Sequence, residues 1–192
     1  MSEGMLDRRQ AVAALLRDPG DLLVVSGLGA ATYDAGAAGD RPLNFYLWGA
    51  MGGAAMIGLG LALAQPARRV LVLTGDGEMM MGVGSLATIA AQAPGNLAIA
   101  VLDNGRFGET GAQRSHTALG ADLAAIARGC GWTATCTVGD PADLGTLRTR
   151  LRQEALFAVL RIAPEEPPRV LPPRDGALLH HRFRAALDGA AA

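Results

Sequence analysis

Short apolar runs alternate along this chain with amphipathic or small-residue stretches, and glycine, proline or polar residues bound each run. Runs of this kind are typical of parallel strands that are buried on both faces. They predict six strands, at residues 22–26, 43–47, 70–74, 97–102, 132–138 and 157–162. Helices are predicted at residues 5–16, 30–38, 51–64, 84–92, 121–129, 140–153 and 177–187. This alternation favours an α/β fold: a doubly wound, mainly parallel six-stranded sheet with helices on both faces.

The chain divides by composition near residue 162. Residues 1–162 contain all the predicted strands and are expected to form one α/β domain. Residues 163–175, APEEPPRVLPPRD, are rich in proline and charge, which predicts an extended strap before the last helix. We expect residues 163–192 to contact another subunit.

Composition and charge exclude several classes of function. Half of the residues are hydrophobic and the net charge is −1, so there is no basic surface to bind nucleic acid or an anionic membrane. All 17 basic residues are arginine, which excludes a lysine Schiff base and a P-loop lysine. Cys130 and Cys136 are too few for a disulfide framework and are expected to be small core residues.

Membrane insertion and secretion are both disfavoured. Leu43–Ala64 carries no charge, yet its five glycines fit a strand, a turn and a buried helix better than a membrane span. The N-terminal residues lack the apolar segment of a signal peptide. We therefore expect a cytoplasmic protein.

The loop after the first strand, residues 26–32 (SGLGAAT), is a weak signal. It resembles a dinucleotide-binding fingerprint, but Thr32 stands at the third glycine position and the acidic residue expected further on is not clear. A tight glycine turn is the simpler interpretation, and an NAD-binding protein is the weakest of the functions considered.

The next two strand ends carry oxygen ligands. Asp76 lies in the sequence GDG directly after the strand 70–74, and Asn104 follows the strand 97–102. Consecutive strands of a βαβ unit can place both side chains together at one edge of the sheet. Carboxylate and amide oxygens suit Mg²⁺, with phosphate oxygens completing its octahedron. Taken alone, GDG is an ordinary Asp–Gly turn; the pair is much more specific.

The sequence resembles the motif of thiamine diphosphate-dependent enzymes, which is GDG, a spacer of about 25 residues and then NN. Here GDG is followed by a spacer over residues 78–102 and then by Asp103-Asn104, so that DN stands in place of NN. The upstream sequence Trp48-Gly49-Ala50-Met51-Gly52 is similar to the glycine–small–apolar element of that family. By this resemblance the Gly49 carbonyl accepts a hydrogen bond from the aminopyrimidine ring of the cofactor, and Ala50 is also expected to contact the cofactor. Met51 would lie between the two rings of the cofactor and hold it in a bent, V-shaped conformation.

The same resemblance implies a binding site for thiamine diphosphate and Mg²⁺. Asp76, Asn104 and the carbonyl of Arg106 would bind the metal. The other residues expected around the cofactor are Gly27, Gly75, Gly77, Glu78, Phe107 and Gly108. Glu78 replaces a small residue of the family, and its charge must point away from the diphosphate.

The resemblance covers only the diphosphate-binding half of such enzymes and is greatest to the sulfopyruvate and phosphonopyruvate decarboxylases, in which Gly-Ser-Leu-Ala-Thr-Ile (residues 84–89) recurs. It implies the β subunit of a split lyase that decarboxylates a small anionic 2-oxo acid and associates with copies of itself. The glutamate that activates the cofactor would come from an α subunit. A carboligase or oxidoreductase subunit, or a non-catalytic diphosphate-binding module, remains an alternative.

Residues after the metal loop are candidates for substrate chemistry. Glu109 and His116 are candidate catalytic residues. Alternatively, Glu109 caps a helix and His116 is a loop residue with no part in catalysis. Arg106, Gln113 and Arg114 could bind an anionic substrate. His180 and His181 are expected at the surface.

Overall fold

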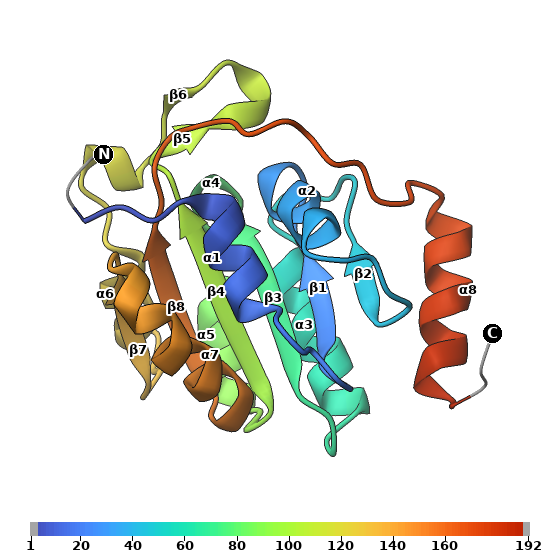
Figure 1. The fold of residues 1–192 in the computed structure, drawn as a ribbon. Helices are drawn as coiled ribbons and strands as arrows, with labels where there is room; N and C mark the ends of the chain where they lie inside the picture. Colours follow the sequence, from blue (N-terminus) through green and yellow to red (C-terminus); the bar gives the residue numbers. More distant parts are fainter. Residues whose placement is uncertain (1–3, 190–192) are drawn as a thin grey trace.

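The computed structural model describes residues 4–189, and Figure 1 shows one main sheet with helices on its two faces. Six parallel strands follow the order β2-β1-β3-β4-β8-β7. Their bounds are β1 Leu23–Ser26, β2 Asn44–Tyr46, β3 Val70–Gly75, β4 Leu97–Asp103, β7 Thr135–Val138 and β8 Leu156–Arg161. The predicted fold class is confirmed, and the predicted strands match these within three residues at each end.

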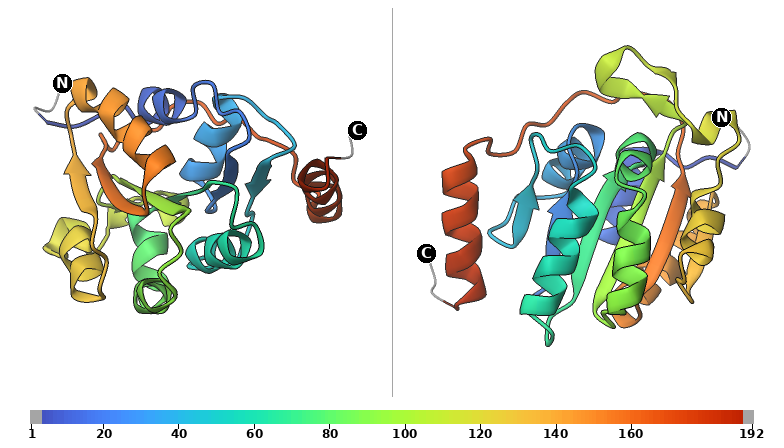
Figure 2. Two further views of the ribbon diagram at one scale, coloured as in Figure 1. Left: turned by 90° about the horizontal axis from the view of Figure 1, so that it is seen from below. Right: turned by 180° about the vertical axis from the view of Figure 1, so that it is seen from behind.

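Helices cover both faces of the sheet, as Figure 2 shows from below. One face carries α1 Arg8–Leu15, α2 Ala30–Ala37 and α7 Leu144–Gln153; the other carries α3 Ala54–Ala64, α5 Ser85–Gln92 and α6 Leu123–Gly129. Two hydrophobic cores result, one on each face. The strand residues point alternately into the two cores, which is why the strands are apolar throughout.

Three elements differ from the prediction. A short helix, α4 Asp76–Met81, begins directly at the end of β3. The segment after β4 forms a small antiparallel ribbon, β5 Arg106–Phe107 and β6 Gln113–Arg114, around the 3₁₀ turn Gly108–Thr110. The predicted helix 140–153 begins as a separate 3₁₀ turn, Pro141–Asp143. One further 3₁₀ turn, Thr117–Leu119, and an isolated bridge between Leu6 and Ile162 complete the described elements.

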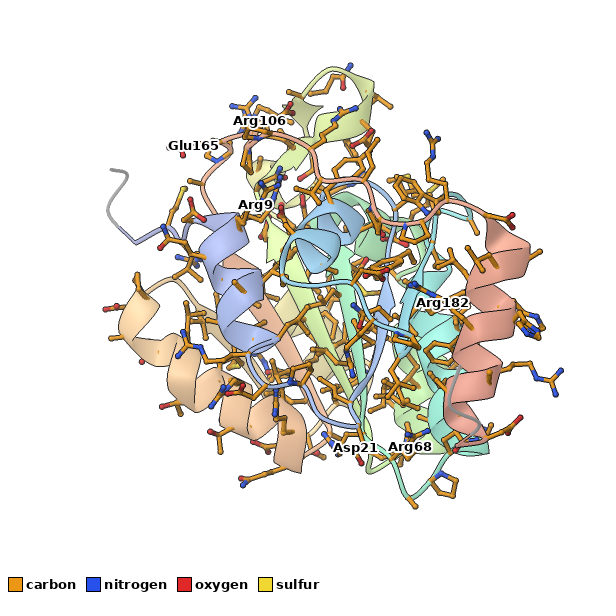
Figure 3. The ribbon with its side chains drawn as sticks, turned by 45° about the vertical axis from the view of Figure 1, so that its right-hand side comes forward. Arg9, Asp21, Arg68, Arg106, Glu165 and Arg182 are labelled. Atoms are coloured by element: carbon orange, nitrogen blue, oxygen red, sulfur yellow. The ribbon has the colours of Figure 1, made fainter. Side chains whose placement is uncertain are left out.

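The strap and the last helix stay with the domain. Residues 163–175 run along the carboxyl edge of the sheet to α8 Gly176–Leu187, which lies beside β2 (Figure 1). Phe183 packs edge-on against Phe45, and Arg182 pairs with Asp40 at 2.7 Å. Arg182 therefore faces β2 (Figure 3). The division at residue 162 and the subunit contact stay predictions, and residues 1–3 and 190–192 lie outside the described part.

No helix within residues 4–189 is long and apolar enough to cross a membrane. The uncharged segment 43–64 forms β2, a turn and α3 instead, as its glycines predict. Gly58 faces the sheet so closely that a Cβ there would lie 2.3 Å from Val72 Cγ2.

Candidate cofactor site

A pocket opens at the carboxyl edge of the sheet, where the loops after β1, β3 and β4 converge. Open α/β sheets bind ligands at this edge, near the point where successive crossovers turn in opposite directions. Here that point lies between β1 and β3, because β1 connects outward to β2 and β3 connects to β4 on its other side. Figure 3 shows Arg106 and Glu165 at this end of the molecule and Asp21 and Arg68 at the opposite end.

Most of the predicted cofactor residues line this pocket. They are Met51, Gly75, Asp76, Gly77, Glu78, Asn104, Arg106, Phe107 and Gly108, together with the candidate Glu109. The remaining predicted residues lie outside its lining: Gly27 is buried behind it, Gly49 and Ala50 are exposed, and His116 packs edge-on against the Phe107 ring.

Asp76 and Asn104 come from paired strands, as predicted. β3 and β4 run parallel with Gly75 opposite Leu102, so the residues that follow leave the sheet side by side. The Asp76 side chain is buried, and burial raises the pKa of its carboxyl group despite hydrogen bonds from two hydroxyl groups. Asn104 Oδ1 accepts a hydrogen bond from the Arg106 N–H at 2.9 Å, which fixes the loop that carries the Arg106 carbonyl.

Two hydroxyl residues that the sequence did not single out orient Asp76. Ser115, which is fully buried, donates a hydrogen bond to Asp76 Oδ2. Thr117 Oγ1 lies 3.0 Å from the same oxygen and 2.7 Å from Asp103 Oδ1, so its single hydroxyl proton can be donated to either of the two carboxylates. The ribbon β5–β6 carries the chain back from the pocket to place these hydroxyls against the end of β3.

Glu78 lines the pocket and holds its carboxylate against Thr74 and Gly27. Its carboxylate accepts a hydrogen bond from Thr74 Oγ1 at 2.8 Å and lies so close to Gly27 that a Cβ there would be 1.6 Å from Glu78 Oε2. The backbone N–H groups of Gly52 and Ala54 also face the carboxylate. Glu78 therefore contacts three segments around the pocket: the loop after β1, the end of β3 and the turn before α3. Only glycine fits at position 27, because any side chain there would clash with the Glu78 carboxylate.

The pocket also contains residues beyond the predicted set. Tyr33 on α2 directs its hydroxyl to Glu109 Oε2 at 3.4 Å, and the strap contributes Glu166, Pro167, Pro168 and Arg169. Glu109 thus lies at the tip of the ribbon, between α2 and the strap. His180 and His181 are exposed on α8, as predicted.

The family model "Thiamine pyrophosphate enzyme, C-terminal TPP binding domain" matches residues 26–162. The chain belongs to this family. The match begins at the end of β1 and ends just after β8, so it includes every loop at the carboxyl edge of the sheet except the strap.

Named relatives within this thiamine pyrophosphate enzyme family extend the comparison. A phosphonopyruvate decarboxylase of Streptomyces viridochromogenes is 47% identical over 93% of this chain and 45% of its own. A sulfopyruvate decarboxylase subunit beta of Methanothermobacter thermautotrophicus is 44% identical over 67% of this chain and 68% of its own. This chain thus spans less than half of the first relative. The crystal structure of benzoylformate decarboxylase from Polynucleobacter necessarius has the same fold, with a TM-score of 0.72 at 19% identity over 85% of this chain and 34% of that one.

The residues present fit thiamine diphosphate and Mg²⁺, the groups that the family implies. A carboxylate, an amide and a backbone carbonyl, from Asp76, Asn104 and Arg106, line one pocket and are hard oxygen donors of the kind that Mg²⁺ prefers. Residue 77 must be glycine because the Phe107 ring packs against its backbone: a Cβ there would lie 2.5 Å from that ring.

The buried charge of Glu78 predicts a distinct pH dependence of stability. Burial raises the pKa of this carboxyl above its usual 4.5, so the unfolded chain releases the proton at a lower pH than the folded one. The free energy of unfolding should then fall as the pH rises above 4.5, and Glu78→Gln should remove this contribution. Urea unfolding of metal-free protein at pH 5 and pH 8 measures both. The variant should gain stability relative to wild type at pH 8; an equal difference at the two pH values would contradict this origin.

Proposed function

We propose that this chain is the diphosphate- and metal-binding β subunit of a thiamine diphosphate-dependent decarboxylase that acts on sulfopyruvate or phosphonopyruvate. The observation that carries the proposal is that one pocket, in a chain 44–47% identical to decarboxylases of these two substrates, gathers the oxygen donors of Asp76, Asn104 and Arg106.

Each part of the pocket has a task in this proposal. Asp76, Asn104 and the Arg106 carbonyl hold Mg²⁺, and Ser115 fixes the Asp76 carboxylate so that it is oriented before the metal binds. When bound, the cofactor accepts the electron pair that is left when the substrate carboxylate departs as CO₂. Met51, exposed at the pocket, supports the cofactor from the loop before α3.

Glu109 is the residue of this chain that we assign to proton handling. It lines the pocket within 3.4 Å of the Tyr33 hydroxyl, whereas His116 lies outside the lining and packs against Phe107. The glutamate that activates the cofactor is supplied by an α subunit in this proposal. The cytoplasmic location stays a prediction.

A partner chain is supported by the outer face of α3. Met56, Ile57 and Leu63 are 42%, 37% and 51% exposed on this helix, and Met81 at the end of α4 is 67% exposed. A helix that is apolar all round is typical of a helix buried within an assembly. We assign this face to contacts with the α subunit and with a second copy of this chain.

The test is a reconstitution with the α chain that this proposal requires, identified by its co-purification with this chain. The two chains together, with thiamine diphosphate and Mg²⁺, should release CO₂ from sulfopyruvate or phosphonopyruvate, and removal of Mg²⁺ with EDTA should stop the reaction. Each chain assayed separately is the control. A complex that binds the cofactor but leaves both substrates intact would contradict the assigned reaction.

A further inference from the structure

The strap closes the cofactor pocket from the side opposite the sheet. Its residues Glu166, Pro167, Pro168 and Arg169 line the same pocket as Asp76 and the other metal-binding residues. Figure 1 shows the strap crossing the carboxyl edge of the sheet, above α2 and beside the ribbon β5–β6. A segment that was expected to contact another subunit therefore also forms a wall of the site.

The strap is held on both sides of Arg169. Arg9 Nη2 donates to the Pro168 carbonyl at 2.8 Å, and Trp48 Nε1 donates to the Pro173 carbonyl at 2.9 Å. Pro172 packs against Gly36, where a Cβ would approach its ring to 3.0 Å. The prolines on both sides of Arg169 restrict the backbone of the strap further. The backbone of Arg169 is therefore preorganised for ligand binding.

Three arginines line the pocket, and they differ in how their charges are used. Arg8 is buried in an ion pair with Asp34. Arg106 is exposed and donates to the Ala112 carbonyl at 3.3 Å, within its own ribbon. Arg169 places its guanidinium 5.3 Å from the centre of the Tyr33 ring.

The one ion pair that Arg169 makes within the described residues is long and exposed. Its Nη2 lies 3.8 Å from Glu109 Oε2, and the two side chains are 56% and 38% exposed. Such pairs contribute little to stability, so exchanging Glu109 for a ligand anion costs little. Glu109 and Glu166 would otherwise repel an anion here, which makes anion binding depend on Arg169.

We infer that Arg169 binds the acidic group at the far end of the substrate, the sulfonate or phosphonate, and thereby determines specificity. The inference rests on the proposed function. A guanidinium presents parallel N–H donors that match two oxygens of such a tetrahedral anion. The ring of Tyr33 supports the guanidinium from one side, and the fixed strap aims it into the pocket.

The test is a substrate comparison in the reconstituted complex. Arg169→Gln should raise KM for sulfopyruvate or phosphonopyruvate by about 10- to 100-fold, the loss expected for one charge-assisted pair, with kcat changed much less. KM for pyruvate, which has no second acidic group, should stay within about 2-fold. Arg169→Lys should retain part of the affinity. Arg174→Gln is the matched control: its guanidinium lies on the same strap but 5.0 Å from the centre of the Trp48 ring.

A binding measurement separates failure of this inference from failure of the proposed function. The reconstituted complex is titrated calorimetrically with 3-phosphonopropanoate, an analogue of phosphonopyruvate that lacks the oxo group. The affinity for this analogue should fall by the same 10- to 100-fold in Arg169→Gln and should not change in Arg174→Gln. Equal losses for pyruvate and the charged substrates, or an unchanged affinity for the analogue, would overturn the role of Arg169. A wild-type complex that decarboxylates neither sulfopyruvate nor phosphonopyruvate nor pyruvate would overturn the proposed reaction. The affinity for the analogue would still test whether Arg169 binds the acidic group.

Discussion

Asp76→Asn is expected to weaken Mg²⁺-dependent binding of thiamine diphosphate by roughly 100-fold or more and to abolish decarboxylation. Replacing a residue that merely orients a metal ligand typically costs 10- to 100-fold, and Asp76 is the one charged ligand in the proposed metal site. The asparagine keeps the shape of the side chain and still accepts a hydrogen bond from Ser115. Equilibrium titration with thiamine diphosphate, with and without Mg²⁺, measures the effect.

Asp103→Asn provides the matched control. Asp103 Oδ1 accepts hydrogen bonds from Thr117 Oγ1 and from the Gly105 N–H at 3.1 Å, and an amide oxygen can accept both. We expect this variant to bind the cofactor within about 10-fold of wild type, since the change also creates the pair of asparagines of the family motif. Equal losses in the two variants would mean that Asp76 is not a metal ligand.

Asp34→Ala is expected to destabilise the fold by about 3–5 kcal/mol. The Asp34 carboxylate is fully buried and pairs with Arg8, which is 7% exposed, and with Arg9 at 3.1 Å. Removing the carboxylate would leave the Arg8 guanidinium buried without a counter-charge. It would also free Arg9, which holds the Pro168 carbonyl of the strap. Urea unfolding of the purified chain measures the loss.

Two comparisons test whether the destabilisation by Asp34→Ala comes from a buried, unpaired charge: a variant of an exposed ion pair, and a double variant that removes both buried charges. Glu154→Gln removes a partner of Arg150 in a half-exposed pair at 2.6 Å and should cost only about 0.3–0.5 kcal/mol. The double change of Arg8→Met with Asp34→Leu should recover much of the stability, because no charge is then left buried. A loss below about 1 kcal/mol for Asp34→Ala would contradict the view that this pair is needed to compensate Arg8.

The central strands could be predicted because burial on both faces leaves a clear sequence pattern. β3 and β4 are apolar at almost every position and end at glycine or polar residues. The ribbon β5–β6 could not be predicted in this way, since each strand has two residues and they are largely exposed. Its position depends on Ser115 and Thr117 reaching Asp76, a contact between distant parts of the chain.

The site shows the same limit. Asp76 and Asn104 follow adjacent strands of one sheet, so strand order was enough to bring them together. Arg169 and Tyr33 meet only because the strap folds back over α2. The prolines predict an extended strap, but its path is set by contacts of Arg9 and Trp48 with its carbonyl groups. The sequence was therefore enough to place Asp76 and Asn104 in one pocket, but not to predict that the strap lines the same pocket.

Native mass spectrometry of the protein purified from its own cells in Mg²⁺-containing buffer tests most directly whether this chain is one half of a split enzyme. We predict a complex of this chain with a second chain, carrying thiamine diphosphate and Mg²⁺ that are lost together in the Asp76→Asn variant. Assemblies of this chain alone, without cofactor and unchanged by that variant, would contradict the proposed function.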